Sequence, residues 1–283
     1  MTTAADGAPK IGLIAGNRRL PFQFADWAKR KGYRLFIAGI KGEADAALRN
    51  ETDGADYEEF YVTQISKVIK FFKRKGVRDV VMIGGIAKAK IKPTLDLAKI
   101  IARLLVMKNK HKGLFTIIMS MFDRGGLTVK SIQSVMPELL IGEGALGKVT
   151  PADGDVKAFE KNWETILKYI RTGAGQAVII YKGEIIACEN VKGTDDIVKR
   201  AAAKRRELGG GSGGFMAKIM EPGQDDRVDL PVVGTGTLET IAKYGFKGVI
   251  VEAGRTIADD VADTIALADK LGVFVYGVKL PGV

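Results

Sequence analysis

Short apolar runs that alternate with amphipathic segments constrain the fold of this chain most strongly. Apolar runs typical of buried strands lie at 10–15, 33–38, 58–62, 78–83, 127–132, 215–220, 247–251 and 273–278. Between them, apolar residues recur at helical spacing over 22–31, 65–75, 93–106, 114–123, 153–171, 194–208 and 257–271. Strands that alternate with helices favour a parallel, doubly wound sheet. We therefore expect an α/β protein whose N-terminal part is Rossmann-like.

A glycine-rich stretch at 142–152 divides the pattern into two halves. Because it shows no clear periodicity, we interpret it as a linker. The sequence then predicts a Rossmann-like N-terminal domain at 1–141, with a parallel sheet, and a C-terminal α/β catalytic domain at 153–283. We expect the ligand cleft between them. In the second domain, strand patterns flank Lys182-Gly183 and predict a hairpin.

The composition excludes several kinds of site. One cysteine, Cys188, cannot form an internal disulfide, and its apolar neighbours favour core packing. One histidine, His111, excludes metal sites built from several histidines and argues against a histidine-based triad. No apolar run is long enough to span a membrane, and the first residues lack a secretion signal. We therefore expect a cytoplasmic location and a site built from carboxylates, Lys, Arg and backbone amides.

The net charge of +11 favours anionic partners, such as nucleotide phosphates, an acidic membrane surface or nucleic acid. Much of this charge lies in helical patterns, for example at 67–75 and 199–206, and we interpret most of it as solvated helix faces. The interleaved aromatic residues that stack on single-stranded nucleic acid are not evident, so we do not expect nucleic acid as a partner.

Two turns at strand ends in the first half could contact phosphate. Gly16 follows the first strand and Leu20-Pro21 precedes a helix, which is a favourable anion-binding arrangement. The full dinucleotide fingerprint is absent, since Asn17, Arg18 and Arg19 stand where further glycines would be. The two cations there could bind a phosphate, or their side chains could prevent a phosphate from approaching the backbone as closely as glycine allows. The second turn, Gly84-Gly85, is followed by three lysines, of which Lys88 is a candidate phosphate contact or part of a basic surface turn.

The most polar loop follows the strand pattern that ends near Met220. It has the sequence Glu-Pro-Gly-Gln-Asp-Asp-Arg-Val-Asp-Leu-Pro and spans 221–231. Asp225, Asp226 and Asp229 can hold a hard cation, and Arg227 can bind a phosphate with two hydrogen bonds. The loop is therefore either a site for a diphosphate with Mg²⁺ or a solvated turn whose Asp side chains bond their own backbone.

Several stretches together resemble a known family. They are the Gln-Asp-x-Arg-x-Asp-Leu-Pro loop with Gly234 and Thr237, Ile11–Gly16 with Leu20-Pro21, Gly175–Ile180, Lys192–Asp195, Lys218, and Val251–Gly254. They occur in the order of the UDP-2,3-diacylglucosamine pyrophosphatase family of the lipid A pathway (LpxI type) and span almost the whole chain. The chain is therefore identified by resemblance as a member of that family.

This resemblance implies a hydrolase that converts UDP-2,3-diacylglucosamine to UMP and 2,3-diacylglucosamine 1-phosphate (lipid X) with the help of Mg²⁺. It implies a lipid-linked UDP-sugar substrate and a peripheral position on the anionic inner membrane, and it leaves a homodimer open. Asp225, Arg227, Lys218 and Glu252 become the candidate catalytic residues, with Asp225 also the metal ligand. The implied substrate-binding residues are Gly16, Asn17, Leu20, Lys88, Gly193, Thr194, Asp195, Gln224 and Asp229.

Two departures from the family pattern keep an alternative open. One is Asn17–Arg19, and the other is the basic stretch at 108–112, where the family tends to carry acidic residues. A chain altered at both places could be a non-catalytic binder of the nucleotide-lipid, or an inactive relative. A third hypothesis, supported by charge alone, is that the chain binds nucleic acid.

Overall fold

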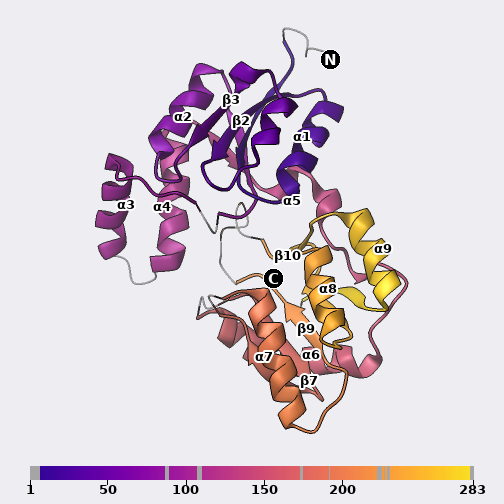
Figure 1. Ribbon diagram of the computed structural model, residues 1–283. Coiled ribbons are helices and arrows are strands. Elements are labelled where there is room, and N and C mark those ends of the chain that lie inside the picture. Colours follow the sequence, from indigo (N-terminus) through magenta and orange to yellow (C-terminus); the bar gives the residue numbers. More distant parts are fainter. Residues whose placement is uncertain are drawn as a thin grey trace. The chain divides into compact units, whose positions relative to one another are not determined.

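The computed structural model describes residues 7–86, 89–106, 110–172, 175–190, 192–221, 225, 227 and 230–280. The chain divides into two compact units. Unit 1 contains 1–136 together with 225–229, and unit 2 contains 137–224 and 230–283. In Figure 1, unit 1 is coloured indigo to magenta, and most of unit 2 is orange to yellow.

Unit 1 is built on a parallel sheet in the order β3-β2-β1-β4-β5. Its strands are β1 (Lys10–Ala15), β2 (Arg34–Ile40), β3 (Tyr57–Phe60), β4 (Asp79–Ile83) and β5 (Thr128–Lys130). Its helices are α1 (Leu20–Arg30), α2 (Ile65–Arg74), α3 (Leu95–Leu105), α4 (Lys110–Arg124) and α5 (Ile132–Val135). Strands β2 and β3 are added on one side of β1, and β4 and β5 on the other. The strand order therefore switches between β1 and β4, which is where open α/β sheets bind ligands. The expected Rossmann-like domain is therefore confirmed.

The turns that follow β1 and β4 lie against each other, backbone to backbone. Gly16 N–H donates to Ile83 O at 2.8 Å, and Asn17 N–H donates to Gly85 O at 2.9 Å. A Cβ atom on Gly16 would lie 2.3 Å from Gly85 O, so a side chain does not fit there. Gly84 has φ +98°, a conformation that L side chains rarely adopt. Glycine at these positions therefore serves close packing of the two strand ends.

Unit 2 contains a mixed sheet in the order β6-β13-β11-β9-β7-β8. Its strands are β6 (Gly144–Ala145), β7 (Ala177–Tyr181), β8 (Glu184–Cys188), β9 (Phe215–Lys218), β11 (Gly248–Glu252) and β13 (Phe274–Val278). Strands β9, β11 and β13 are parallel, and β7 runs antiparallel to both β8 and β9. The expected hairpin is confirmed, with Lys182 and Gly183 at positive φ as a tight hairpin turn requires.

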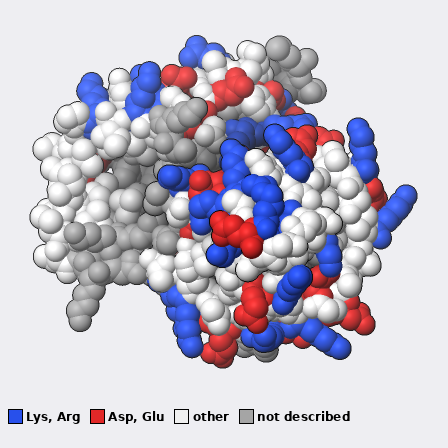
Figure 2. All heavy atoms as spheres, turned by 60° about the horizontal axis from the view of Figure 1, so that its bottom comes forward, with Lys and Arg blue, Asp and Glu red and all other residues white. Residues whose placement is uncertain are grey.

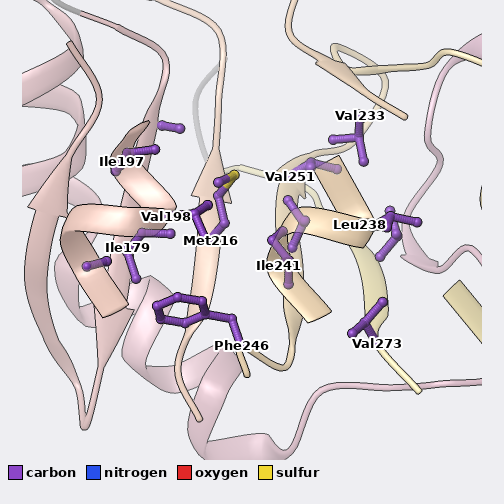
Figure 3. Close-up of a cluster of buried hydrophobic side chains, with 14 of the residues drawn as sticks. Ile179, Ile197, Val198, Met216, Val233, Leu238, Ile241, Phe246, Val251 and Val273 are labelled. Carbon is purple, nitrogen blue, oxygen red and sulfur yellow. The ribbon is translucent and has the colours of Figure 1, made fainter. Parts of the chain in front are cut away.

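Helices cover both faces of this second sheet. They are α6 (Asp153–Ile170), α7 (Thr194–Glu207), α8 (Thr235–Lys243) and α9 (Val261–Leu271), and a small pair of strands, β10 (Val232–Val233) and β12 (Ile257–Ala258), lies beside them. Figure 3 shows one apolar layer, in which Ile179 and Met216 of the sheet meet Val198 of α7 and Ile241 of α8. The opposite face packs on α6 through Phe159, Ile166 and Ile170. Alternate residues of the strands therefore fill two separate cores.

The expected linker at 142–152 differs from the structure. Gly144 and Ala145 form β6, which pairs antiparallel with β13 through Gly277 and Tyr276. Lys148 N–H also donates to Asp269 Oδ1 at 2.7 Å. The backbone of this stretch also lies close to β13, since a Cβ atom on Gly277 would lie 1.9 Å from Gly142 O. The stretch is a packed part of unit 2, and the cleft expected between the domains stays a prediction.

Three smaller expectations on element ends were wrong. Pro93 does not begin a helix, because Thr94 caps α3 by accepting from Leu97 N–H at 3.1 Å. The strand expected at 127–132 ends at Lys130, since Ser131 caps α5. The helix expected from 257 starts at Val261, because 257–258 pair with β10 and Asp260 is the cap. In the described residues, no helix is long and apolar enough to cross a membrane.

Replacing Gly16 with Ala should test the contact between the two strand ends. We expect Gly16→Ala to lower the free energy of unfolding by about 2–3 kcal/mol or more, because the clash is with backbone that cannot rotate away. Thermal unfolding followed by circular dichroism measures this change. Gly54→Ala is the matched control, since nothing lies within 4 Å of its added Cβ atom. Equal melting temperatures for the two variants would contradict the proposed packing.

Candidate functional site

In unit 1, the predicted residues Gly16 and Asn17 lie at the carboxyl ends of β1 and β4. Asn17 Nδ2 donates to Glu43 Oε2 at 2.5 Å, and Glu43 is 8% exposed. The other amide atom, Asn17 Oδ1, is buried and has no hydrogen-bond partner within the described part of the chain. Buried polar atoms are normally paired, so Asn17 Oδ1 is an exception at this strand edge. Leu20, also predicted, is 5% exposed and starts α1 as a core residue.

The two cations after Asn17 take up distinct positions at the start of α1. Arg18 is exposed and has φ +74°, a left-handed conformation uncommon for a residue other than glycine. Arg19 is the cap residue before α1 and is also exposed. Arg18 therefore takes a backbone conformation that glycine adopts more readily than other residues. The departure Asn17–Arg19 therefore keeps a tight turn while adding positive charge at its surface.

In unit 2, Lys218 is the last residue of β9 and is 8% exposed. Its Nζ donates to Val232 O at 3.1 Å and to Thr194 Oγ1 at 3.5 Å. A buried ammonium group is costly unless acceptors surround it, and these oxygens supply that compensation. The strand register therefore places a fixed positive charge at the carboxyl edge of this sheet.

The residues 193–195 lie at the start of α7. Gly193, with φ +83°, is the cap residue, and Thr194 is the first residue of the helix. Thr194 Oγ1 donates to Glu189 Oε1 at 2.8 Å, and it accepts from Lys218. Asp195 Oδ1 accepts from Thr240 Oγ1 of α8 at 3.1 Å. The structure therefore brings Thr194 to Lys218, while Asp195 links α7 to α8.

Glu252, the last residue of β11, is 4% exposed and holds two neighbouring segments. One oxygen accepts from Met220 N–H at 3.2 Å, and the other accepts from Arg255 Nη1 at 3.1 Å. Glu252 thereby fixes the start of the polar loop that follows Met220. A carboxylate held in this way is a positioning group, and Arg255 compensates its charge.

Asp225 and Arg227 form a two-pronged ion pair in unit 1. Arg227 Nε donates to Asp225 Oδ1 at 2.8 Å, Arg227 Nη2 donates to Asp225 Oδ2 at 2.6 Å, and Arg227 N–H also reaches Oδ1 at 3.1 Å. The hydrogen bonds from the Arg227 side chain hold the pKa of Asp225 below its usual range. Arg227 Nη1 also lies 3.9 Å from Asp123 Oδ1. The pair keeps Asp225 ionised and presents Arg227 beside it.

The predicted residues Lys88, Gln224 and Asp229 lie outside the described residues. Within the described residues, no group of three His, Cys, Asp or Glu side chains is arranged to hold a metal ion. Cys188, expected in the core, is half-buried, and burial raises the pKa of its thiol. A raised pKa argues against a nucleophilic role for this cysteine.

Sequence reasoning missed two buried carboxylates, Glu43 and Glu189. Glu43 follows β2, where an acidic residue in a Rossmann-like fold faces the ligand edge, so its position after the second strand was a usable signal. Glu189 accepts from Gln176 N–H at 2.8 Å and from Thr194, and it is 8% exposed. Only the pairing of β7 with β8 brings Glu189 beside Gln176, and local sequence does not show that contact.

Two solved structures show only distant similarity to this chain. A biotin carboxylase domain of 2-oxoglutarate carboxylase from Hydrogenobacter thermophilus is 13% identical, with a TM-score of 0.27 over 71% of this chain and 42% of that chain. L-threonine dehydrogenase from Phytophthora infestans is 12% identical, with a TM-score of 0.32 over 95% of this chain and 76% of that chain. Both TM-scores are too low to support a shared architecture.

The chain resembles known proteins much more clearly in sequence than it resembles these two solved structures. The family model for the LpxI N-terminal domain matches residues 10–139, and the model for the LpxI C-terminal domain matches residues 142–276. The chain is also 30% identical over 276 residues to the UDP-2,3-diacylglucosamine pyrophosphatase LpxI of Caulobacter vibrioides, covering 95% of this chain and 97% of that protein. With both domains matched in order over nearly the whole chain, this protein belongs to the LpxI family.

Proposed function

We propose that this chain hydrolyses the pyrophosphate bond of UDP-2,3-diacylglucosamine and releases UMP and 2,3-diacylglucosamine 1-phosphate. The observation that carries the proposal is the match to a UDP-2,3-diacylglucosamine pyrophosphatase over 95% of this chain. The chemistry of the candidate residues agrees with it, because fixed cations such as Lys218 and an ionised carboxylate such as Asp225 are what hydrolysis of a diphosphate requires.

Cations and a backbone turn would hold the nucleotide and the phosphates. The β1–β4 edge of unit 1 is the usual nucleotide position in this fold, so we assign the UMP part of the substrate to Gly16 and Asn17. Lys218 and Arg227 would contact phosphate oxygens. Lys218 is held by Val232 O and Thr194 Oγ1, and Arg227 is held by Asp225. Groups fixed before substrate binds lose little freedom when charge develops on the phosphate.

Asp225 is the carboxylate that we assign to the water or to Mg²⁺. Its two oxygens are bound to Arg227, and its pKa is lowered, so it is an anion at neutral pH. Mg²⁺ is commonly held by one or two carboxylates together with substrate phosphates, so a single Asp fits that ion when the diphosphate is present. When bound, Mg²⁺ would neutralise charge on the diphosphate. Glu252 would fix Met220, at the start of the polar loop.

The assay that tests this proposal measures UMP released from the diacyl substrate, with Mg²⁺ and with EDTA. We expect UMP and lipid X in equal amounts with Mg²⁺, and loss of most of the activity in EDTA, since the diphosphate charge is then uncompensated. Tight binding of substrate without UMP release would favour the non-catalytic binder. Equal rates in Mg²⁺ and EDTA would remove the metal from the mechanism and leave the hydrolase in place.

Substitution of Asp225 should separate catalysis from binding. We expect Asp225→Ala to lower kcat by at least about 100-fold, the scale on which a positioned acid–base group acts, with lipid X binding retained. Its pair with Arg227 is partly exposed, so the loss of stability at pH 7 should be below about 1 kcal/mol. Asp26→Ala, on the exposed face of α1, is the control. A near wild-type rate for Asp225→Ala would exclude Asp225 from the mechanism.

The hydroxyl group of Thr194 should matter because it joins Lys218 to Glu189. Thr194→Val removes an acceptor from Lys218 and a donor from Glu189, so we expect about tenfold lower kcat/KM and about 1–2 kcal/mol less stability. Thr194→Ser keeps the hydroxyl group and should restore most of both. Steady-state kinetics and thermal melts of the two variants make the comparison. If Val and Ser variants behave alike, the hydroxyl group is not part of the site.

A further inference from the structure

One face of helix α3 exposes large apolar side chains to solvent. Leu95 is 81% exposed, Leu105 is 72% and Ile101 is 49%. The apolar surface continues at both ends, with Ile91 at 70% and Val106 at 85%. Single exposed apolar residues are common, but a contiguous set on one element marks an interaction surface.

Helix α3 is firmly held on its other side, so this exposure is a property of the folded unit. Thr94 Oγ1 donates to Thr63 O at 2.7 Å while capping α3. Asp96 is 7% exposed and accepts from both Ser66 N–H at 2.7 Å and Ser66 Oγ at 2.6 Å. Ile100 belongs to the core of unit 1. These contacts fix the rotation of α3 about its axis and keep the same residues outward.

The outward residues form a stripe with cations along its side. At 3.6 residues per turn, Leu95, Ala98, Ile101, Ala102, Leu105 and Val106 occupy an arc of about 140°. The exposed residues Lys99 and Arg103 lie on one flank of this arc, and Lys92 is exposed just before the helix. The acidic residue of α3, Asp96, is turned inward to Ser66. In Figure 2, the left edge, where α3 and α4 lie in Figure 1, is mainly white, with blue side chains above it.

An apolar face flanked by cations, without exposed acids, is the pattern of a helix that lies in a bilayer interface. We propose that α3 docks this protein on an anionic bilayer, with Leu95, Ile101 and Leu105 among the acyl chains and Lys99 and Arg103 at the headgroups. A second copy of the chain fits this face less well, because it would bring like charges together in a protein of net charge +11. The proposal rests on the proposed function for its purpose, since a diacyl substrate resides in a membrane.

Vesicle binding by the full chain tests the proposal without any hydrolysis. The probes are vesicles of phosphatidylethanolamine with phosphatidylglycerol, and vesicles of phosphatidylcholine alone, with binding measured by cosedimentation. We expect binding to the anionic vesicles that weakens with salt and is much weaker to phosphatidylcholine. The double variant Ile101→Gln with Leu105→Gln should lose about tenfold or more in partition coefficient. Lys99→Gln with Arg103→Gln should lose about tenfold on anionic vesicles alone.

Control variants test whether the loss of any exposed apolar residue, or of any two exposed cations, would weaken vesicle binding equally. Leu208→Gln removes an exposed apolar residue of unit 2, and Lys67→Gln with Lys70→Gln removes two exposed cations of α2, so both should bind vesicles as the wild type does. All variants should hydrolyse detergent-dispersed substrate at the wild-type rate, which keeps this test separate from that of the proposed function. The proposal would be overturned if the wild-type protein did not bind anionic vesicles. It would also be overturned if the Ile101/Leu105 double variant bound them as the wild type does. A dimer in sedimentation velocity that these substitutions dissociate while vesicle binding persists would overturn it as well.

Discussion

Close contact between the ends of β1 and β4 is the constraint on which the first unit depends. The two strands leave the sheet at the position where its winding reverses, and their turns meet through backbone hydrogen bonds at Gly16, Asn17 and Gly85. No side chain at Gly16 could be accommodated, because Gly85 O lies where its Cβ atom would be. Backbone groups are thereby placed at the edge where this kind of sheet receives ligands.

The charged side chains among the candidate site residues already have hydrogen-bond partners of the protein itself. Arg227 holds both oxygens of Asp225, Arg255 holds Glu252, and the hydroxyl group of Thr194 stands between Lys218 and Glu189. Isolated charges of this kind would be expensive to bury, and paired ones are stable yet able to exchange partners. In the proposed function, phosphate oxygens would be further acceptors for Lys218 in unit 2 and for Arg227 in unit 1, beside the partners that each already has.

Much of this fold could be predicted from local pattern, and the failures have physical causes. The strand at 10–15 and the hairpin around Lys182-Gly183 were predicted correctly, because burial and turn chemistry act locally. The stretch 142–152 was predicted to be a linker, because glycines needed for a turn at Gly144 and for packing at Gly147 resemble those of a flexible linker. The contact of Thr194 with Glu189 could not be predicted from local sequence either, since the two side chains meet only in the folded unit. Glu189 itself became visible only through strand pairing, and the exposed face of α3 only through knowledge of which side of that helix is packed.

The polar loop at 225–229 belongs by its contacts to unit 1, although it lies in the sequence between two segments of unit 2. A single cut in the gene therefore cannot divide this protein into two halves that each keep their own loops. Exchange of either half alone would leave Asp225 and Arg227 paired with each other but would separate Arg227 from Asp123 of its own unit. We therefore expect the two halves to have been inherited together, since one segment of unit 1 lies within the sequence of unit 2.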